Sequence, residues 1–245
     1  MAAIASVALK VGLEIHVELA TRSKMFSRAP NPAHPDFDAA EPNTLLDPTV
    51  LALPGALPVM NGRAVEMAVM VGLALGCTIA PSTRWDRKSY FYPDLPKSYQ
   101  ISQYDMPLCF DGAVDLPATD SAGFLLAAEE GLPRRIGIIR AHLEEDAGKM
   151  LHEAPGGGAI DFSIVDLNRA GAPLLEIVTQ PDFDNADDVV AFARMLRHLC
   201  RFLGVTEGVI QKGHIRFVTI IISILTLDDG SLVRTPIVAI KKINS

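Results

Sequence analysis

Apolar and polar residues alternate strictly near the start of the chain, within residues 9–19. Every second position is apolar: Val11, Leu13, Ile15, Val17 and Leu19. Because successive side chains of a strand point to opposite faces, this period predicts a strand with one buried face. The other face carries Gly12 and the polar residues Glu14, His16 and Glu18, so its chemistry is acidic with one imidazole.

Two segments show the 3.6-residue period of amphipathic helices. The first follows Asn61, a residue type that caps helices, and extends to about Leu75, where Gly76 ends it. Its predicted apolar stripe is Val65, Ala68, Val69, Gly72 and Leu73. The second covers residues 185–203 and ends at Gly204.

Further strands follow from the same patterns. Residues 134–145 alternate, and one predicted face is Ile136, Ile138, Arg140, His142 and Glu144. Residues 162–167 and 173–179 read as strands around a turn, and 209–243 is strand-rich with a hairpin turn at 228–230. Residues 154–158 are a hairpin connection, and 28–59 are loop. Strands and helices do not alternate regularly, which favours an α+β fold with helices packed on an antiparallel sheet.

Composition narrows the class of protein. The chain has 245 residues, 49% of them hydrophobic, which is typical of a folded globular protein. No apolar run reaches the roughly 18 residues of a membrane span, and the N-terminus lacks the charge order of a signal peptide. A net charge of −7 means that contacts to nucleic acid would need a local basic patch or another chain.

The three cysteines are odd in number and far apart: Cys77, Cys109 and Cys200. This spacing disfavours a disulfide framework and a zinc site built from cysteine alone. A reducing cytoplasm is therefore the expected compartment.

Glu14, His16 and Glu18 are the sharpest local feature. Carboxylate and imidazole groups at alternate strand positions can converge on Mg²⁺ or Mn²⁺. Spacing alone nevertheless favours an ordinary solvated strand face over a metal site. Residues 142–146 form a second acidic cluster that could hold a metal or act as acid and base, or could be an exposed turn.

Glu176 lies inside the apolar run Pro173–Val178, where a carboxylate is costly unless it is paired or metal-bound. It could equally point to water from an edge strand. Arg87 and Lys88 lie among aromatic residues and could bind phosphate or stack on a base, although a loop packed by its own aromatics explains them as well. P-loop, dinucleotide-binding, nucleophile-elbow and HExxH zinc motifs are absent, so any use of ATP would not be of P-loop type.

Four stretches taken in order resemble one family. They are GLEIHVEL at 12–19, DRKSYFYPDLPKSYQISQYD at 86–105, HLEEDAGK at 142–149 and DLNRAGAPLLEIVTQPD at 166–182, with EPNT at 41–44 and LPGALPVMN at 53–61 in support. Together they resemble the B subunits of the aspartyl/glutamyl-tRNA(Asn/Gln) amidotransferases, the GatB/GatE family, over residues 11–207.

The resemblance implies that residues 1–245 form a glutamine-synthetase-like catalytic cradle, which is expected to be truncated at its C-terminal end. It implies a cytoplasmic ligase that forms C–N bonds with glutamine as amido donor. ATP and Mg²⁺ would activate the side-chain carboxylate of Glu-tRNA(Gln) or Asp-tRNA(Asn) as an acyl phosphate, and ammonia would displace the phosphate. The expected partners are the amidase and small subunits of the amidotransferase and the acceptor end of the misacylated tRNA, with no membrane.

The resemblance also assigns site residues. The expected metal ligands are Glu14, His16, Glu144, Glu145 and Glu176. The expected catalytic residues are Glu14, His16 and Glu145. The expected contacts to phosphate or to the acceptor end are Arg87, Lys88 and Arg169.

The sequence departs from the family pattern in three places. Residues 47–50 lack the CxxC of zinc-binding members, so no zinc is expected. Val218 and Ile220 stand where an acidic residue and Asn are expected, and residues 239–242 lack the expected Glu and Asn. The helical and tail domains that engage tRNA are expected to be absent.

These departures leave alternatives open. The chain could be an active subunit or a non-catalytic, degenerate or truncated remnant that keeps the fold and the interface to the amidase. A stand-alone ATP–carboxylate ligase acting on a small molecule is a more distant possibility.

Overall fold

The computed structural model describes residues 3–118, 133–154 and 156–240. Within them lie two α-helices, α1 (Gly62–Ala74) and α2 (Ala186–Phe202), and one 3₁₀ turn, η1 (Ile210–Lys212). The strands are β1 (Ile4–Glu18), β2 (Thr78–Ile79), β3 (Asp86–Ser89), β4 (Tyr99–Ser102), β5 (Cys109–Leu116), β6 (Arg134–Glu145), β7 (Lys149–Glu153), β8 (Ala159–Asp166), β9 (Pro173–Thr179), β10 (Ile215–Leu227), β11 (Leu232–Arg234) and β12 (Val238–Ile240).

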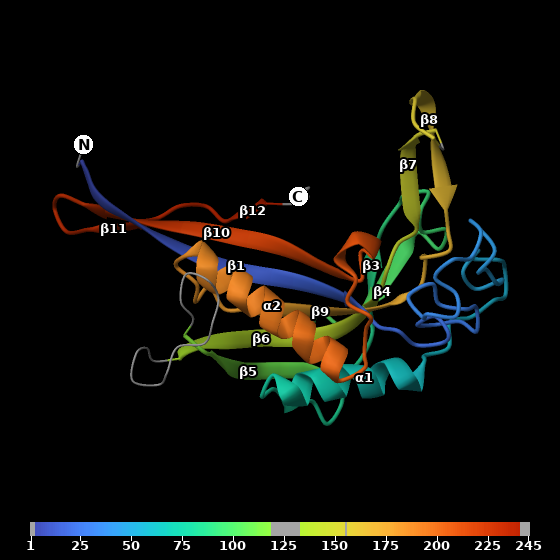
Figure 1. The fold of residues 1–245 in the computed structure, drawn as a ribbon, viewed down its shortest axis with the longest axis horizontal. Coiled ribbons are helices and arrows are strands. Elements are labelled where there is room, and N and C mark those ends of the chain that lie inside the picture. Colours follow the sequence, from blue (N-terminus) through green and yellow to red (C-terminus); the bar gives the residue numbers. More distant parts are fainter. Residues whose placement is uncertain (1–2, 119–132, 155, 241–245) are drawn as a thin grey trace.

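One antiparallel sheet organises the molecule. Its strand order is β11-β10-β1-β9-β6-β5-β2, and β12 also pairs with β10. Two separate hairpins, β3–β4 and β7–β8, stand beside it (Figure 1). The predicted α+β class with an antiparallel sheet is confirmed. Neither described helix is long and apolar enough to cross a membrane.

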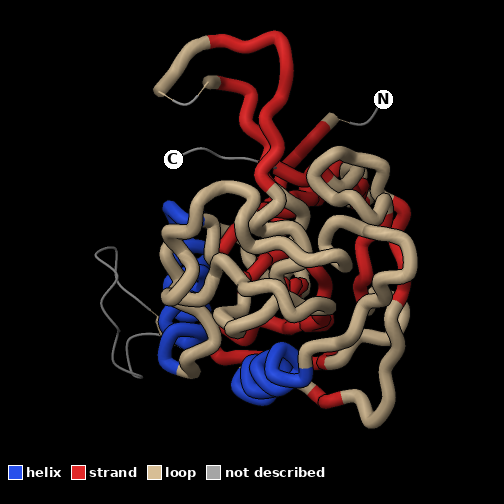
Figure 2. The backbone as a smooth tube through the Cα atoms, turned by 90° about the vertical axis from the view of Figure 1, so that its right-hand side faces the viewer, coloured by secondary structure: helices blue, strands red, loops and turns tan. Residues whose placement is uncertain are grey.

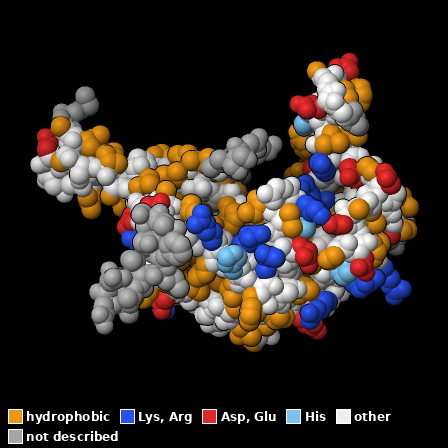
Figure 3. Space-filling view, viewed as in Figure 1, with side chains coloured by type: hydrophobic (Ala, Val, Ile, Leu, Met, Phe, Trp, Pro, Cys, Tyr) orange, Lys and Arg blue, Asp and Glu red, His pale blue; other side chains and the backbone are white. Residues whose placement is uncertain are grey.

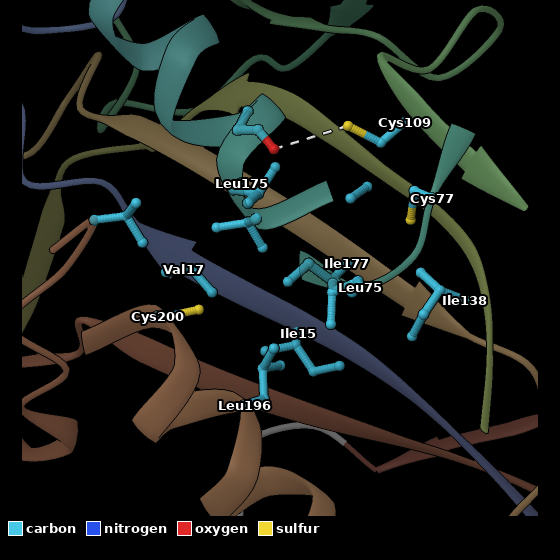
Figure 4. Close-up of a cluster of buried hydrophobic side chains, with 14 of the residues drawn as sticks. Ile15, Val17, Leu75, Cys77, Cys109, Ile138, Leu175, Ile177, Leu196 and Cys200 are labelled. Carbon is cyan, nitrogen blue, oxygen red and sulfur yellow. Dashed lines mark hydrogen bonds between the residues drawn. The ribbon is translucent and has the colours of Figure 1, made fainter. Parts of the chain in front are cut away.

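The hydrophobic core lies between one face of the sheet and the two helices. The five apolar residues that were predicted to share a face, four on β1 and Leu19 directly after it, are all at most 4% exposed. From α2 they meet Leu196 and Cys200, which Figure 4 shows close to Ile15 and Val17. The helix boundaries predicted from Asn61 and Asn185 are also correct, because each side chain caps its helix by accepting a backbone N–H bond.

The apolar stripe predicted for α1 is rotated from the buried one. The buried residues are Ala64, Met67, Ala68, Val71 and Gly72, whereas Leu73 is 61% exposed. Apolar residues lie on nearly every side of this helix, so its period does not fix the rotation. The helix approaches β5 closely at Gly72, where a Cβ atom would lie 2.4 Å from Sγ of Cys109.

A β-bulge changes the predicted faces of β6. The β6–β9 register shifts by one residue between Ile138 and Arg140. Ile136 and Ile138 therefore join the core, whereas Arg140 and the alternate residues after it do not. The prediction that all five residues share one face is wrong, because period-2 alternation is interrupted where the extra residue is inserted.

Loops gather at one end of the sheet, and a strand arm extends from the other. The segment 28–59 contains no helix or strand, as predicted, and Figure 2 shows loops covering the near end of the sheet. At the opposite end β1 and β10 continue past the helices together with β11 (Figure 1). The predicted turn at 228–230 connects β10 to β11. The face of the sheet opposite the helices carries the polar residues.

Candidate metal centre

Three titratable residues form a row across the middle of the sheet. His16 on β1 lies directly opposite Glu176 on β9, and Glu176 lies directly opposite His142 on β6. All three side chains are on the face opposite the helices. Directly opposed residues in antiparallel strands have Cβ atoms about 4.5–5.5 Å apart, which brings the three polar groups into contact.

Two further carboxylates complete the cluster. Glu14, two residues before His16, places Oε1 at 3.5 Å from His16 Nε2. Glu176 Oε2 lies 3.6 Å from the same nitrogen, and Glu144 Oε1 lies 3.8 Å from it. Two sets of three residues could each hold a metal ion. In each set every residue offers one ligand atom, and these atoms lie within 4.8 Å of one another. One set is Glu14, His16 and Glu176, and the other is His142, Glu144 and Glu176. Glu176 belongs to both sets.

The protonation of the cluster reflects burial and crowding. Burial and the nearby charge of Glu176 raise the pKa of Glu144 to about 7. Burial lowers the pKa of His142 to about 4 despite the charge of Glu176. Burial also opposes the charged forms of His16 and Glu176. Their mutual interaction and the charges of neighbouring residues together outweigh it, so the pKa of His16 is raised and that of Glu176 lowered.

The donor set suits a divalent cation. It contains three carboxylates and two imidazoles, a mixture that Mg²⁺ and Mn²⁺ accept. A neutral His142 can offer a lone pair as a ligand, and its buried Nδ1 has no hydrogen-bond partner among the described residues. The residues present therefore fit the group that the family resemblance implies.

A second buried acidic pair adjoins the cluster. Glu18 is 3% exposed and Asp146 is 7% exposed. Burial and the charge of Asp146 raise the pKa of Glu18 to about 8. Arg216 on β10 reaches both carboxylates, with nitrogen–oxygen distances of 3.2 Å to Glu18 and 2.8 Å to Asp146. This arginine links β10 to the turn after β6.

Glu145 does not join the metal cluster. It follows Glu144 on β6, and adjacent strand residues point to opposite faces. Its carboxylate pairs with Lys97 and accepts a bond from the Ile101 backbone N–H at 3.0 Å. The structure thus brings together four of the five expected ligands, and the fifth lies on the other side of the strand.

A pocket lies on the Glu145 side of β6. Its lining includes Glu145, Lys97, Lys24 and Gly171. Lys24 is fully buried, and its ammonium donates only to the Leu167 carbonyl oxygen, at 3.3 Å, among the described residues. Burial lowers the pKa of Lys24 to about 7, so near neutral pH the pocket contains an amine that readily gains or loses a proton.

The three basic residues expected to bind substrate lie in different settings. Lys88, on β3, is near enough for its charge to lower the pKa values of Glu144 and His142. Arg87 is exposed and stacks over the Tyr99 ring at 5.1 Å. Arg169 donates to the backbone carbonyls of residues 147 and 148, beside the Glu18–Asp146 pair.

The strand opposite Glu14 is apolar. Val218 on β10 lies directly across from Glu14, and Ile220 lies across from Gly12. Neither can ligate a cation, so of these three alternate positions on β10 only Arg216 carries a polar side chain. Of the two later departures, Ala239 lies on β12 directly across from Ile220, and Lys242 lies outside the described residues.

His142 is the cluster member that sequence reasoning did not select as a ligand. The signal that could have found it is its position two residues before Glu144, the same spacing that links Glu14 to His16. Arg216 and Lys97 carried no local signal, because each meets its carboxylate partner only through folding.

Comparison with protein families gives a match over almost the whole chain. A family model described as the GatB/GatE catalytic domain matches residues 9–245. The match extends past residue 207, where the motif-based resemblance ended, and therefore includes β10 and the strands that follow it.

Curated relatives agree with the family model. The B subunit of an aspartyl/glutamyl-tRNA(Asn/Gln) amidotransferase of Thermomicrobium roseum is 49% identical over 84% of this chain and 39% of its own length. The protein of that name from Rhodopirellula baltica is 46% identical over 96% of this chain and 44% of its own. The B subunit of a chloroplastic/mitochondrial glutamyl-tRNA(Gln) amidotransferase of Ricinus communis is 47% identical over 84% of this chain and 35% of its own length. The chain spans about two fifths of the length of these relatives.

Proposed function

The chain belongs to the GatB/GatE family, and from this premise we propose that it is the catalytic cradle in the B subunit of a tRNA amidotransferase. Its reaction would be ATP-dependent amidation of the glutamate or aspartate carried by a misacylated tRNA. The observation that supports this most directly is the His16–Glu176–His142 row with Glu14 and Glu144 beside it.

The cluster would hold Mg²⁺ through Glu14, His16, His142, Glu144 and Glu176. A bound divalent cation would neutralise the phosphate oxygens of ATP, which otherwise repel an attacking carboxylate. The side-chain carboxylate of the glutamate or aspartate on the tRNA would attack the γ-phosphorus of ATP. This step would release ADP and form an acyl phosphate. Attack by ammonia at the acyl carbon would then release inorganic phosphate and leave the amide.

Residues around the cluster would position the reactants. Lys88 lies near the cluster at the β3–β4 hairpin and can pair with a phosphate oxygen. Arg216 would keep Glu18 and Asp146 together, which fixes β10 against β6 beside the ligands. Arg87 and Arg169 remain candidates for contacts with the acceptor end.

The pocket behind Glu145 is a candidate entry route for ammonia. Glu144 faces the metal cluster and Glu145 faces the pocket, so one strand separates the two. A carboxylate, a paired lysine and the buried amine of Lys24 are groups that can accept and return a proton from ammonium. Ammonia would come from the amidase of the complex, and the small subunit would join the two larger ones.

A non-catalytic function is the second candidate, favoured by one specific observation. Val218 occupies the position directly across from Glu14, so the Glu14 end of the cluster borders on an apolar strand. If cation binding needs a carboxylate there, the chain would keep the fold and its interface to the amidase without activating ATP.

A calorimetric titration of the purified chain with ATP, with and without Mg²⁺, tests the proposal. We expect binding only with Mg²⁺, and a loss of at least about tenfold in affinity for His16→Ala and Glu176→Gln, because each removes a ligand. Glu66→Gln is the matched control, since it removes an exposed carboxylate of α1.

The Val218→Asp variant separates the two candidates. Binding by the unaltered chain supports the catalytic function. Binding by Val218→Asp alone would favour the non-catalytic one. Absence of binding in both folded forms would contradict the proposal that this chain builds the nucleotide site.

A further inference from the structure

The outer face of α2 carries a basic stripe in an acidic protein. Arg194, His198 and Arg201 are exposed and stand at i, i+4 and i+7, the spacing of one helix face. Phe192, Leu196 and Cys200 are buried against the sheet on the opposite side. Figure 3 shows side chains in the shared colour of Lys and Arg, and a histidine, over the position of α2.

Within the part of the chain that the structure describes, acidic side chains do not pair with these charges. Arg194 and Arg201 make no ion pair or side-chain hydrogen bond among the described residues, although the chain has a net charge of −7. The segment from Val189 to Thr206 contains no acidic residue. Arg134, in contrast, is bound by Asp184 and Asp188 near the start of the helix.

The stripe has structural support from the following loop. Gly208 packs between two arginine stems: a Cβ atom there would lie 2.9 Å from Cγ of Arg201 and 3.5 Å from Cγ of Arg197. Arg197 also donates from Nε to the Gly208 carbonyl oxygen at 2.6 Å. The loop therefore restricts these side chains, which lowers the entropy lost when they bind a partner.

An exposed aromatic ring ends the stripe. Phe202 is 89% exposed, four residues after His198 on the same side of the helix. The distance from Arg194 to Phe202 along the axis is about 12 Å at 1.5 Å per residue. Each strand of a DNA duplex carries a phosphate about every 3.4 Å of axis, and at a spacing of this order the stripe can span roughly three phosphates.

We propose that the outer face of α2 binds RNA, with Arg194, Arg197 and Arg201 on phosphates and Phe202 stacked on an unpaired base. This inference rests on the proposed function, in which a tRNA is the substrate. An acidic protein would also fit the arginines and the ring, but the proposed substrate of this chain is an RNA, whose phosphates and bases match both groups. Basic side chains interleaved with an aromatic platform are typical of single-stranded nucleic-acid sites.

The test is fluorescence anisotropy of a labelled tRNA transcript titrated with the full chain between about 50 and 200 mM salt. Arg194→Gln/Arg201→Gln removes two charges with a residue that suits helices. We expect about tenfold weaker binding. The slope of log K against log salt concentration should also become shallower by about 1.4–1.8, because two phosphate contacts are lost. Arg22→Gln/Arg63→Gln, which alters two exposed arginines elsewhere, is the charge-matched control and should change the slope little.

Phe202→Ala tests the stacking contact separately. It should weaken binding by about 5- to 150-fold, the range of one base–aromatic stack, without changing the salt slope. Equal losses in the control variant, or none in the α2 variants, would overturn the proposal. Displacement of the tRNA by polyglutamate at equal charge concentration would assign the stripe to an acidic protein instead.

The Mg²⁺–ATP titration distinguishes this inference from the proposed function. A chain that binds Mg²⁺–ATP but no tRNA keeps the proposed reaction and overturns the RNA surface. A chain that binds tRNA through α2 but no Mg²⁺–ATP loses the proposed reaction and keeps that surface. Retained Mg²⁺–ATP binding in the α2 variants also shows that they are folded.

Discussion

Glu144 and His16 share a cluster in which a proton and a cation compete for the same atoms. The pKa of Glu144 is raised to about 7 and that of His16 is raised above its usual value. Glu144 therefore holds a proton below about pH 7, and His16 keeps its proton to a higher pH than a free imidazole, so a metal ion must displace protons. We expect Mg²⁺ or Mn²⁺ affinity to fall as pH decreases through 7, by up to about tenfold per unit for each proton released.

Calorimetric Mn²⁺ titrations from about pH 8 down to about pH 6 measure this dependence. Glu144→Gln removes one of the competing protons, so its slope of log K against pH should be smaller by about one. A slope that is unaffected by Glu144→Gln would mean that the carboxylate does not hold the ion. Glu66→Gln, on the surface of α1, should keep the slope of the unaltered chain.

The Lys97–Glu145 pair is a test of burial at the residue scale. The two side chains are 8% and 1% exposed. Lys97→Met leaves a buried carboxylate without its cation, and we expect the free energy of unfolding to fall by about 3–5 kcal/mol. Arg63→Met breaks the exposed pair with Glu66 and should cost no more than about 1 kcal/mol in the same urea titration.

The pH dependence of that loss has a definite sign. Burial already raises the pKa of Glu145 in the folded state, so the folded form favours the neutral acid. The deficit of Lys97→Met is therefore fully present above the pKa of the folded variant and shrinks as pH falls and Glu145 becomes protonated. A deficit that does not change with pH would argue against an unpaired carboxylate as its cause.

Alternation along a strand explains both the success and the failure of the residue predictions. Glu14 and His16 were identified from their own period, and the row across β1, β9 and β6 unites them with Glu176. Glu145 was assigned from a motif, but its neighbour Glu144 faces the cluster, so alternation sends Glu145 to the opposite side. His142 satisfied the same alternation rule. The β6 bulge, however, has no signature in the sequence.

At the scale of elements, α1 depends on a glycine for its approach to β5. A Cβ atom on Gly72 would lie 2.4 Å from Cys109 Sγ and 3.2 Å from Ile79 Cδ1. Gly72→Ala should lower the free energy of unfolding by about 1–3 kcal/mol through overpacking, against a helix-propensity gain of about 1 kcal/mol. Chemical denaturation measures the balance.

Gly62→Ala is the matched control within the same helix. No atom lies within 4 Å of the added Cβ, so the substitution should be neutral or slightly stabilising. Equal effects of the two substitutions would show that helix propensity alone determines them. The sequence period placed α1 and put Gly72 on its buried side, but it did not fix the rotation, because apolar residues lie on nearly every side of the helix.

The order of strands in the whole molecule was beyond sequence reasoning. β1 is the first strand, yet it lies between β10 and β9, which come much later in the chain. Local patterns predict each strand, but pairing depends on tertiary packing between distant segments. The same pairing extends β1 and β10 into an arm with little core beneath it, where Val7 is 62% and Ile237 is 67% exposed.

Self-association through this arm is the prediction at the scale of the molecule. Exposed apolar residues beside the short edge strands β11 and β12 offer a surface for pairing with another chain. Val7→Lys/Ile237→Lys should slow aggregation after dilution from urea several-fold, measured by light scattering.

Leu57→Lys/Leu73→Lys is the control, because it adds the same charge at exposed positions outside the arm. Both double variants bring the net charge of −7 closer to zero, and this change by itself promotes association. Slower aggregation in the arm variant alone would therefore identify the arm as the contact. Equal slowing in both variants would contradict that assignment.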